Sequence, residues 1–229
     1  MKTRLPRRML VAVLATLCLA APPLAAQQSG ADNPPEYVPP KRGAPSGTIG
    51  GGTRGLHALP LTALAPQQHT GLTLGAQPAL YYYTPAAARP RLTLRPSNDA
   101  AAPPLVDLEL PAPSGNGIQR LDLATLGVRL APGVEYRWTV SLAGEKRDAS
   151  GLIQRVEPSA DLAQRLAATS GRARYALLAK EGVWYDALDE VSRSIDAAPN
   201  NPVPARHRAA LLEQIGLTAV ARYERQRIE

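Results

Sequence analysis

The chain has 229 residues, with 26 Lys and Arg against 19 Asp and Glu, so its formal charge is +7 at pH 7. Its single cysteine, Cys18, lies in an N-terminal apolar run, which excludes disulfides, cysteine metal sites and thiolate catalysis in the rest of the chain. Stability must therefore come from an apolar core, and the length allows one or two small domains.

Residues 1–26 have the features of a secretory signal peptide. Four basic residues and no acidic one precede an apolar run, 9–21, that is too short to span a bilayer: Lys2, Arg4, Arg7 and Arg8. We therefore predict an exported protein, periplasmic or secreted, without stable membrane insertion after cleavage; a retained anchor is the alternative. Without these four charges the formal balance falls to +3, which gives no indication of a nucleic-acid partner.

Residues 27–68 are rich in Gly, Pro, Ser and Gln and contain few large apolar side chains. Such a stretch buries too little surface to offset its ordering entropy, so we predict an extended or disordered arm. Its Gly-rich piece, 42–55, lacks the following helix and the Lys-Ser or Lys-Thr pair of a phosphate-binding loop. A linker, or an arm packed along the next domain, is the better interpretation.

Residues 69–157 are predicted to be a β-domain. Apolar and polar residues alternate strictly from Val134 to Leu142, which is typical of a strand with one buried face and places Trp138 in the core. Turn-forming clusters separate six shorter candidate strands: 72–74, 79–84, 91–95, 105–110, 118–123 and 152–156. Short strands joined in this way favour an antiparallel, immunoglobulin-like sandwich.

Residues 158–229 change to a helical period. Ser159, Ser170 and Asn201 are candidate N-caps, and glycines at 182 and 216 are candidate helix stops. Apolar residues recur at helical spacing from Trp184 to Ile195, and we expect Trp184 in the core. The sequence thus predicts four helices after the sandwich.

An internal repeat runs through this helical region. Gly182 and Ala187 recur as Gly216 and Ala221, and the pair 177–178 recurs as 211–212 at the same offset. This offset matches the tetratricopeptide period of about 34 residues, and the small residues at helix contacts resemble the same pattern. The predicted fold class is therefore α+β: an N-terminal sandwich followed by a small tetratricopeptide-like hairpin region packed on it.

Four blocks together resemble the exported bacterial family DUF928, a domain of unknown function. They cover residues 42–55, 151–157, 182–188 and 211–217, within a resemblance that spans about 40–220. Relatives often carry a cysteine after the first block, where this chain has Leu56-His57, so no disulfide can hold the arm here. The family has no established activity; the resemblance implies an envelope sensor with a CHASE2 domain as a candidate partner.

No catalytic constellation stands out in the sequence, so we expect a protein that is not an enzyme and that needs no cofactor or metal. His57, His69 and His207 have no metal-ligand spacing, and we expect them to be exposed to solvent. Tyr81 and Tyr83 share one face of a strand and form a candidate binding face, against ordinary packing as the alternative.

A second candidate site combines two family blocks. Tyr185 and Asp186 lie off the apolar stripe of their helix and could face a groove together with Arg155 and Glu157. Mutual packing of sandwich and helices would bring the same blocks together without any ligand.

Three functions remain open. The first is a non-catalytic binding or adaptor protein that contacts an envelope protein. The second is a binder of an anionic envelope polymer through Arg89, Arg91 and Arg95, the last two on one strand face. The third is a glycan or peptide hydrolase with Glu157 and Asp186 as acid and base.

Overall fold

A computed structural model describes residues 33–40, 59–99, 101–143 and 148–228. The predicted signal peptide and the Gly-rich piece 42–55 lie outside the described residues, so both predictions remain untested.

The larger sheet has five strands in the order β2-β8-β7-β4-β5. Its strands are β2 (Gly71–Thr73), β4 (Pro90–Pro96), β5 (Val106–Glu109), β7 (Glu135–Leu142) and β8 (Ala149–Arg155). Burial alternates along β7 as its sequence predicts, with Trp138 fully buried. The prediction of an antiparallel sandwich is wrong at one edge, because β2 runs parallel to β8, with Gly71 opposite Ile153.

The smaller sheet has three antiparallel strands in the order β1-β3-β6. They are β1 (Thr62–Ala63), β3 (Ala79–Thr84) and β6 (Gly117–Asp122). Strand β1 and the buried Leu64 and Ala65 fall inside the predicted arm. The arm therefore does not extend to residue 68: its last part belongs to the sheet, because four apolar residues in five, 61–65, are enough for a short strand to reach the core.

Five helices follow β8: α1 (Ala160–Ala167), α2 (Gly171–Lys180), α3 (Trp184–Ala197), α4 (Pro202–Gln214) and α5 (Thr218–Gln226). Two predicted N-caps are confirmed, since Ser159 Oγ accepts from the Leu162 N–H at 3.2 Å and Asn201 Oδ1 from the Val203 N–H at 3.0 Å. Ser170 precedes α2 as predicted, but its side chain makes no capping hydrogen bond. Helix α5 was not predicted as a separate helix.

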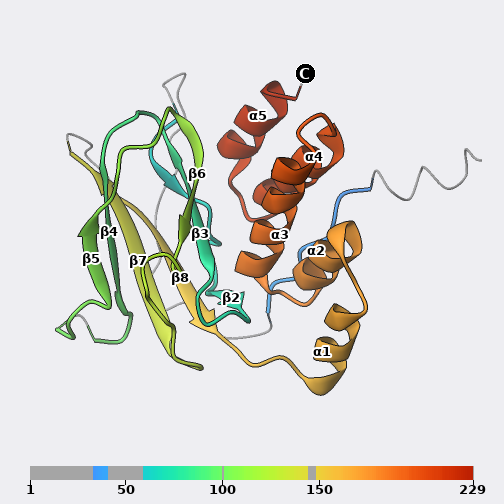
Figure 1. Ribbon diagram of the computed structural model, residues 1–229, viewed down its shortest axis with the longest axis horizontal. Coiled ribbons are helices and arrows are strands. Elements are labelled where there is room, and N and C mark those ends of the chain that lie inside the picture. Colours follow the sequence, from blue (N-terminus) through green and yellow to red (C-terminus); the bar gives the residue numbers. More distant parts are fainter. Residues whose placement is uncertain (1–32, 41–58, 100, 144–147, 229) are drawn as a thin grey trace, which may run out of the picture. The chain divides into compact units, whose positions relative to one another are not determined.

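The elements form three layers, and the smaller sheet is the middle one (Figure 1). The five-stranded sheet covers one face of β3, and α3 packs against β2 and β3 on the other side. The architecture is thus a mixed α+β fold with a sandwich-like pair of sheets and a helical layer. One apolar core runs through all three layers, from Leu92 and Trp138 to Leu188 and Leu211.

A glycine in β8 makes this packing possible. A Cβ built on Gly151 would lie 2.6 Å from the Ala65 Cβ and 2.7 Å from Trp138 Nε1. We predict that Gly151→Ala lowers the free energy of unfolding by about 2 kcal/mol, since overpacking a dense core forces side chains from their rotamers. Urea unfolding measures the loss, and Gly115→Ala, with nothing within 4 Å, is the neutral control. Equal midpoints for both variants would contradict this account.

Candidate functional site

Tyr185, a predicted site residue, is buried in the core rather than in a groove. Its hydroxyl donates to the Leu152 carbonyl at 2.9 Å and accepts from Trp138 Nε1 at 2.8 Å. Burial raises the pKa of this tyrosine, so the hydroxyl stays protonated. The Tyr185 ring also lies against β2, where a Cβ on Gly71 would come within 2.6 Å of it. Tyr185 therefore joins the helical layer to β7, β8 and β2.

Asp186 is partly buried at the first turn of α3 and fixes the helix to β2. Its carboxylate accepts from the Leu74 N–H at 3.1 Å and from the Thr73 hydroxyl. Burial, and to a lesser degree the charge of Asp189, raises the pKa of Asp186 above its ordinary value. This carboxylate anchors one layer to the next.

Of the other two predicted site residues, Arg155 lies close to the contact between Asp186 and β2, and Glu157 lies at the surface. Arg155 pairs with Thr73 across the parallel ladder of β8 and β2, and Thr73 donates to Asp186. The Arg155 guanidinium also forms an ion pair with Glu157 at 2.9 Å, and the Glu157 side chain is 65% exposed. The family blocks 151–157 and 182–188 thus converge, and the contacts among them are those of mutual packing.

Of the two interpretations of Tyr81 and Tyr83, a binding face or ordinary packing, the structure favours packing. Both are buried, because β3 is the central strand of the middle layer and is covered on both sides. Tyr81 donates to Asp189 on α3 at 2.8 Å, and the Tyr83 ring contacts the Tyr223 ring of α5 edge-on at 4.9 Å. The tyrosine face therefore binds the chain's own helices.

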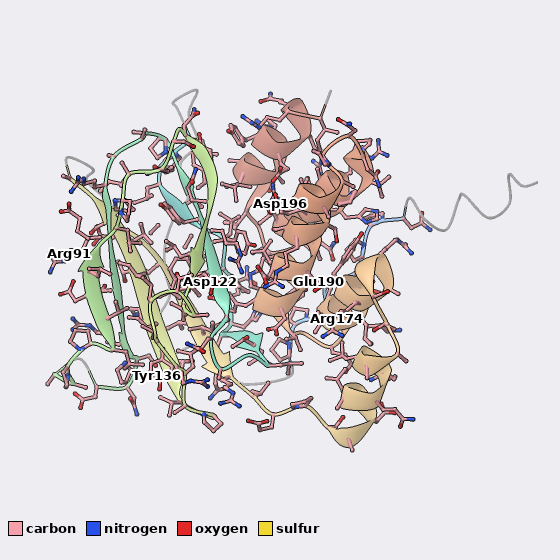
Figure 2. All side chains as sticks on the ribbon, viewed as in Figure 1. Arg91, Asp122, Tyr136, Arg174, Glu190 and Asp196 are labelled. Atoms are coloured by element: carbon pink, nitrogen blue, oxygen red, sulfur yellow. The ribbon has the colours of Figure 1, made fainter. Side chains whose placement is uncertain are left out.

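A polar group between sheet and helices, which we name the interlayer cluster, was not predicted. It consists of Tyr81, Arg120, Asp122, Asp189 and Arg193. Asp189 is its centre: Arg120 Nε lies 2.9 Å away and an Arg193 nitrogen 2.8 Å away, and the Asp189 side chain is 16% exposed. Arg120 also pairs with Asp122 at 2.8 Å, at the end of β6 that faces α3 (Figure 2).

Polar contacts continue from this cluster along α4 and α5. Arg208 forms two bonds to the Glu224 carboxylate, at 2.8 and 2.6 Å, and donates to Ser192 at 3.1 Å. The Arg208 and Glu224 side chains are 12% and 8% exposed. From sequence, the carboxylates of α3 are expected on a solvated helix face, and no local pattern distinguishes Asp189 from an exposed carboxylate. Asp189 pairs with Arg120 between α3 and β6, and Arg208 pairs with Glu224 between α4 and α5, so these two ion pairs join separate elements of the fold.

The expectation of solvent-exposed histidines is wrong for His207 and His69, while His57 lies outside the described residues. His207 is buried, and its Nδ1 lies 2.7 Å from the Tyr175 hydroxyl. His69 is partly buried, with its Nε2 at 2.7 Å from the Tyr37 hydroxyl. Burial lowers the pKa of His69, which favours the neutral ring.

A short segment of the predicted arm, residues 34–40, lies extended across the helical layer, and we name it the strap. Tyr37 is buried, and the strap contacts α2, α4 and the start of α3 through hydrogen bonds and ring contacts. The Gly-rich piece 42–55, for which a linker or an arm packed along the next domain was predicted, lies outside the described residues. No sequence pattern pointed to Tyr37 or to its partner Gln214, which is 177 residues away.

The arginines proposed to bind an anionic polymer have partners of their own. Arg91 pairs with Asp107 at 2.7 Å, and Arg89 pairs with Glu109 at 3.2 Å. Arg91 lies on the side of the five-stranded sheet that is far from the helices (Figure 2). Carboxylates of β5 thus neutralise part of this face.

The model of one family, Domain of Unknown Function (DUF928), matches residues 49–224, most of the chain. The chain belongs to this family. A search of curated proteins finds no match. DUF928 membership confirms the resemblance found in the sequence blocks, two of which, 182–188 and 211–217, supply Trp184 and Gln214 to the strap contacts.

Two properties bear on binding. Within the described segments, no helix has the length and apolar character needed to cross a bilayer. Nor do His, Cys, Asp or Glu side chains gather there in a group of three that could hold a metal ion.

The raised pKa of Asp186 predicts a pH effect on stability. Because the folded state disfavours the charged carboxylate, this group stabilises most below its ordinary pKa of 3.8 and loses that contribution as pH rises through the raised value. Asp186→Asn removes the titration, so the variant should gain stability relative to the parent between about pH 4 and about pH 7. Urea midpoints at both values test this, with exposed Asp161→Asn as control; a relative loss at higher pH would contradict it.

The interlayer cluster predicts a second effect. Asp189→Ala leaves the buried Tyr81 hydroxyl and two arginines without their shared acceptor, so we expect a loss of about 2 kcal/mol in the free energy of unfolding. The control is Glu213→Ala, which breaks the exposed pair with Arg225 and should cost less than about 1 kcal/mol. Similar losses would show that Asp189 is no more than a surface charge.

Proposed function

We propose that this DUF928 protein is an exported, periplasmic or secreted, non-catalytic binding or adaptor protein that contacts an envelope protein through its helical layer. A sensor carrying a CHASE2 domain is the partner that the family resemblance favours. The single observation that supports this proposal is the strap, because it shows the helical layer holding an extended polypeptide segment through backbone hydrogen bonds.

The repeat supports a tetratricopeptide-like reading of the helical layer. The hairpins α2–α3 and α4–α5 start their second helices at Trp184 and Thr218, which are separated by the same offset as the repeated glycines. Gly182 and Gly216 precede these helices with φ of +73° and +85°, a region that glycine adopts without strain. Paired helices of this kind present protein-binding surfaces. An immunoglobulin-like arrangement of the sheets is proposed on the strand pattern alone.

Polymer binding is the second candidate, since Arg89 and Arg91 remain 72% and 59% exposed beside their carboxylate partners. A hydrolase is the third, although Glu157 and Asp186 occupy different environments: one is exposed and paired with Arg155, the other is bonded to β2.

Affinity purification of the tagged protein from envelope extracts tests the proposal. Two matched variants each reverse two exposed positive charges: Lys180→Glu/Arg206→Glu on the helical layer and Arg89→Glu/Arg91→Glu on the sheet. We expect a stoichiometric protein partner that the helical variant loses, by about tenfold or more, and the sheet variant keeps.

A different outcome would redirect the proposal. Recovery of an acidic polymer that weakens steeply with salt, and is lost with Arg89→Glu/Arg91→Glu, would establish polymer binding instead. Turnover of an envelope glycan or peptide by the purified chain would establish an enzyme.

A further inference from the structure

We propose that the surface under the strap is a binding site for extended peptide segments with a tyrosine near prolines, and that residues 34–40 are its resident occupant, which a partner segment displaces. This inference rests on the proposed adaptor function and names the ligand class for the helical layer. The strap sequence, Pro-Pro-Glu-Tyr-Val-Pro-Pro, shows what chemistry the surface accepts.

In the first contact, the Gln214 side chain forms hydrogen bonds with the strap backbone at two positions. Gln214 Oε1 accepts from the Tyr37 N–H at 2.7 Å, and Gln214 Nε2 donates to the Pro35 carbonyl at 2.9 Å. The two bonds lie on either side of Glu36, whose side chain is exposed. A side-chain amide used in this way holds an extended chain whatever residue stands at the middle position.

The second contact lies at the end of α2. The Val38 N–H donates to the Ala179 carbonyl at 3.1 Å. Gly182 allows the strap to approach, since a Cβ there would come within 2.9 Å of the Val38 carbonyl oxygen and 3.3 Å of Pro40. Gly216, at the equivalent place in the second repeat, has nothing within 4 Å. Gly182 therefore has the strap beside it and Gly216 does not, although both glycines have a positive φ that other residues adopt only with strain.

The third contact selects an aromatic side chain. The Tyr37 ring meets the Trp184 ring edge-on at 5.1 Å and stacks on His69 at 5.7 Å, and its hydroxyl lies 2.7 Å from His69 Nε2. Trp184 is itself fixed by its Nε1–H, which donates to the Leu64 carbonyl at 2.9 Å. Buried Tyr and Trp pairs of this kind dominate binding energies, and the polar partner favours tyrosine over phenylalanine.

Burial alternates over residues 34–38 of the strap, as it does along a docked strand. Pro35 and Tyr37 are buried, whereas Glu36, Val38 and Pro39 are exposed. The surface thus specifies a Pro-x-Tyr segment by its buried side chains and backbone, and leaves the intervening positions free.

Because the strap is covalently attached, it acts at an effective concentration of about 1 mM. A free peptide of the same sequence therefore competes poorly, while a partner that makes additional contacts can displace it. The strap makes binding selective for such partners.

Peptide complementation tests the proposal in the full chain. Tyr37→Ala removes the aromatic anchor, and fluorescence anisotropy then measures binding of a labelled peptide with the sequence of residues 34–40. We expect the variant to bind this peptide at least about tenfold more tightly than the unmodified chain. A peptide with alanine in place of tyrosine should bind about tenfold more weakly.

Two matched glycine variants of the chain test where the peptide binds. In the Tyr37→Ala background, adding Gly182→Ala should reduce peptide affinity about tenfold, because the new Cβ meets the peptide backbone. Adding Gly216→Ala should change it less than about threefold. If Tyr37→Ala fails to fold by circular dichroism, Val38→Pro replaces it, because this change removes the N–H bonded to Ala179 and keeps the Tyr37 side chain.

The outcomes are decisive. A folded variant that binds the peptide no better than the unmodified chain, or equal affinity with either added alanine, would overturn the inference and leave the strap as a structural element. A partner recovered through Lys180 and Arg206 in that case would keep the adaptor function and move its site elsewhere on the helical layer.

Discussion

The attachment of the helices to the sheets depends on one buried hydroxyl. Tyr185 is placed at the start of α3, so its hydroxyl reaches both Trp138 Nε1 in β7 and the Leu152 carbonyl in β8. A buried polar group of this kind is costly unless each of its bonds is made, and here both are. This requirement fixes where the start of α3 lies against β7 and β8. Gly71 and Gly151 then leave room for the two large rings.

Much of the fold could be predicted where local sequence and burial coincide. The alternation in β7 and the caps at Ser159 and Asn201 follow from one-sided burial and from unsatisfied backbone groups at helix ends. Strand β1 is only two residues long and carries no period to detect. The parallel pairing of β2 with β8 joins segments that five other strands separate in the sequence. The spacing of residues along a chain does not predict pairing between strands so far apart.

The candidate sites were predicted less well, for a related reason. Tyr185 and Tyr83 have the composition of contact residues, and they are contact residues, but their partners are other elements of the same chain. Single-sequence reasoning cannot tell an internal contact face from an external one, because both use tyrosine in the same way. The strap surface was not predicted, because Gln214, which hydrogen-bonds the strap backbone, resembles any other polar residue at the end of a helix.

The strap has a consequence for the order of folding. Tyr37 and Gln214 are 177 residues apart, and Trp184 and Leu64 are 120 apart, so the first and last described segments close on each other. Contacts of such long range form late, because the entropy of closing the loop must be overcome before they stabilise anything. A chain that emerges from its N-terminus would hold residues 34–40 undocked until α4 had been completed, because Gln214 is the last residue of that helix. For that interval the strap is accessible to chaperones and to other binding surfaces, and docking ends that exposure.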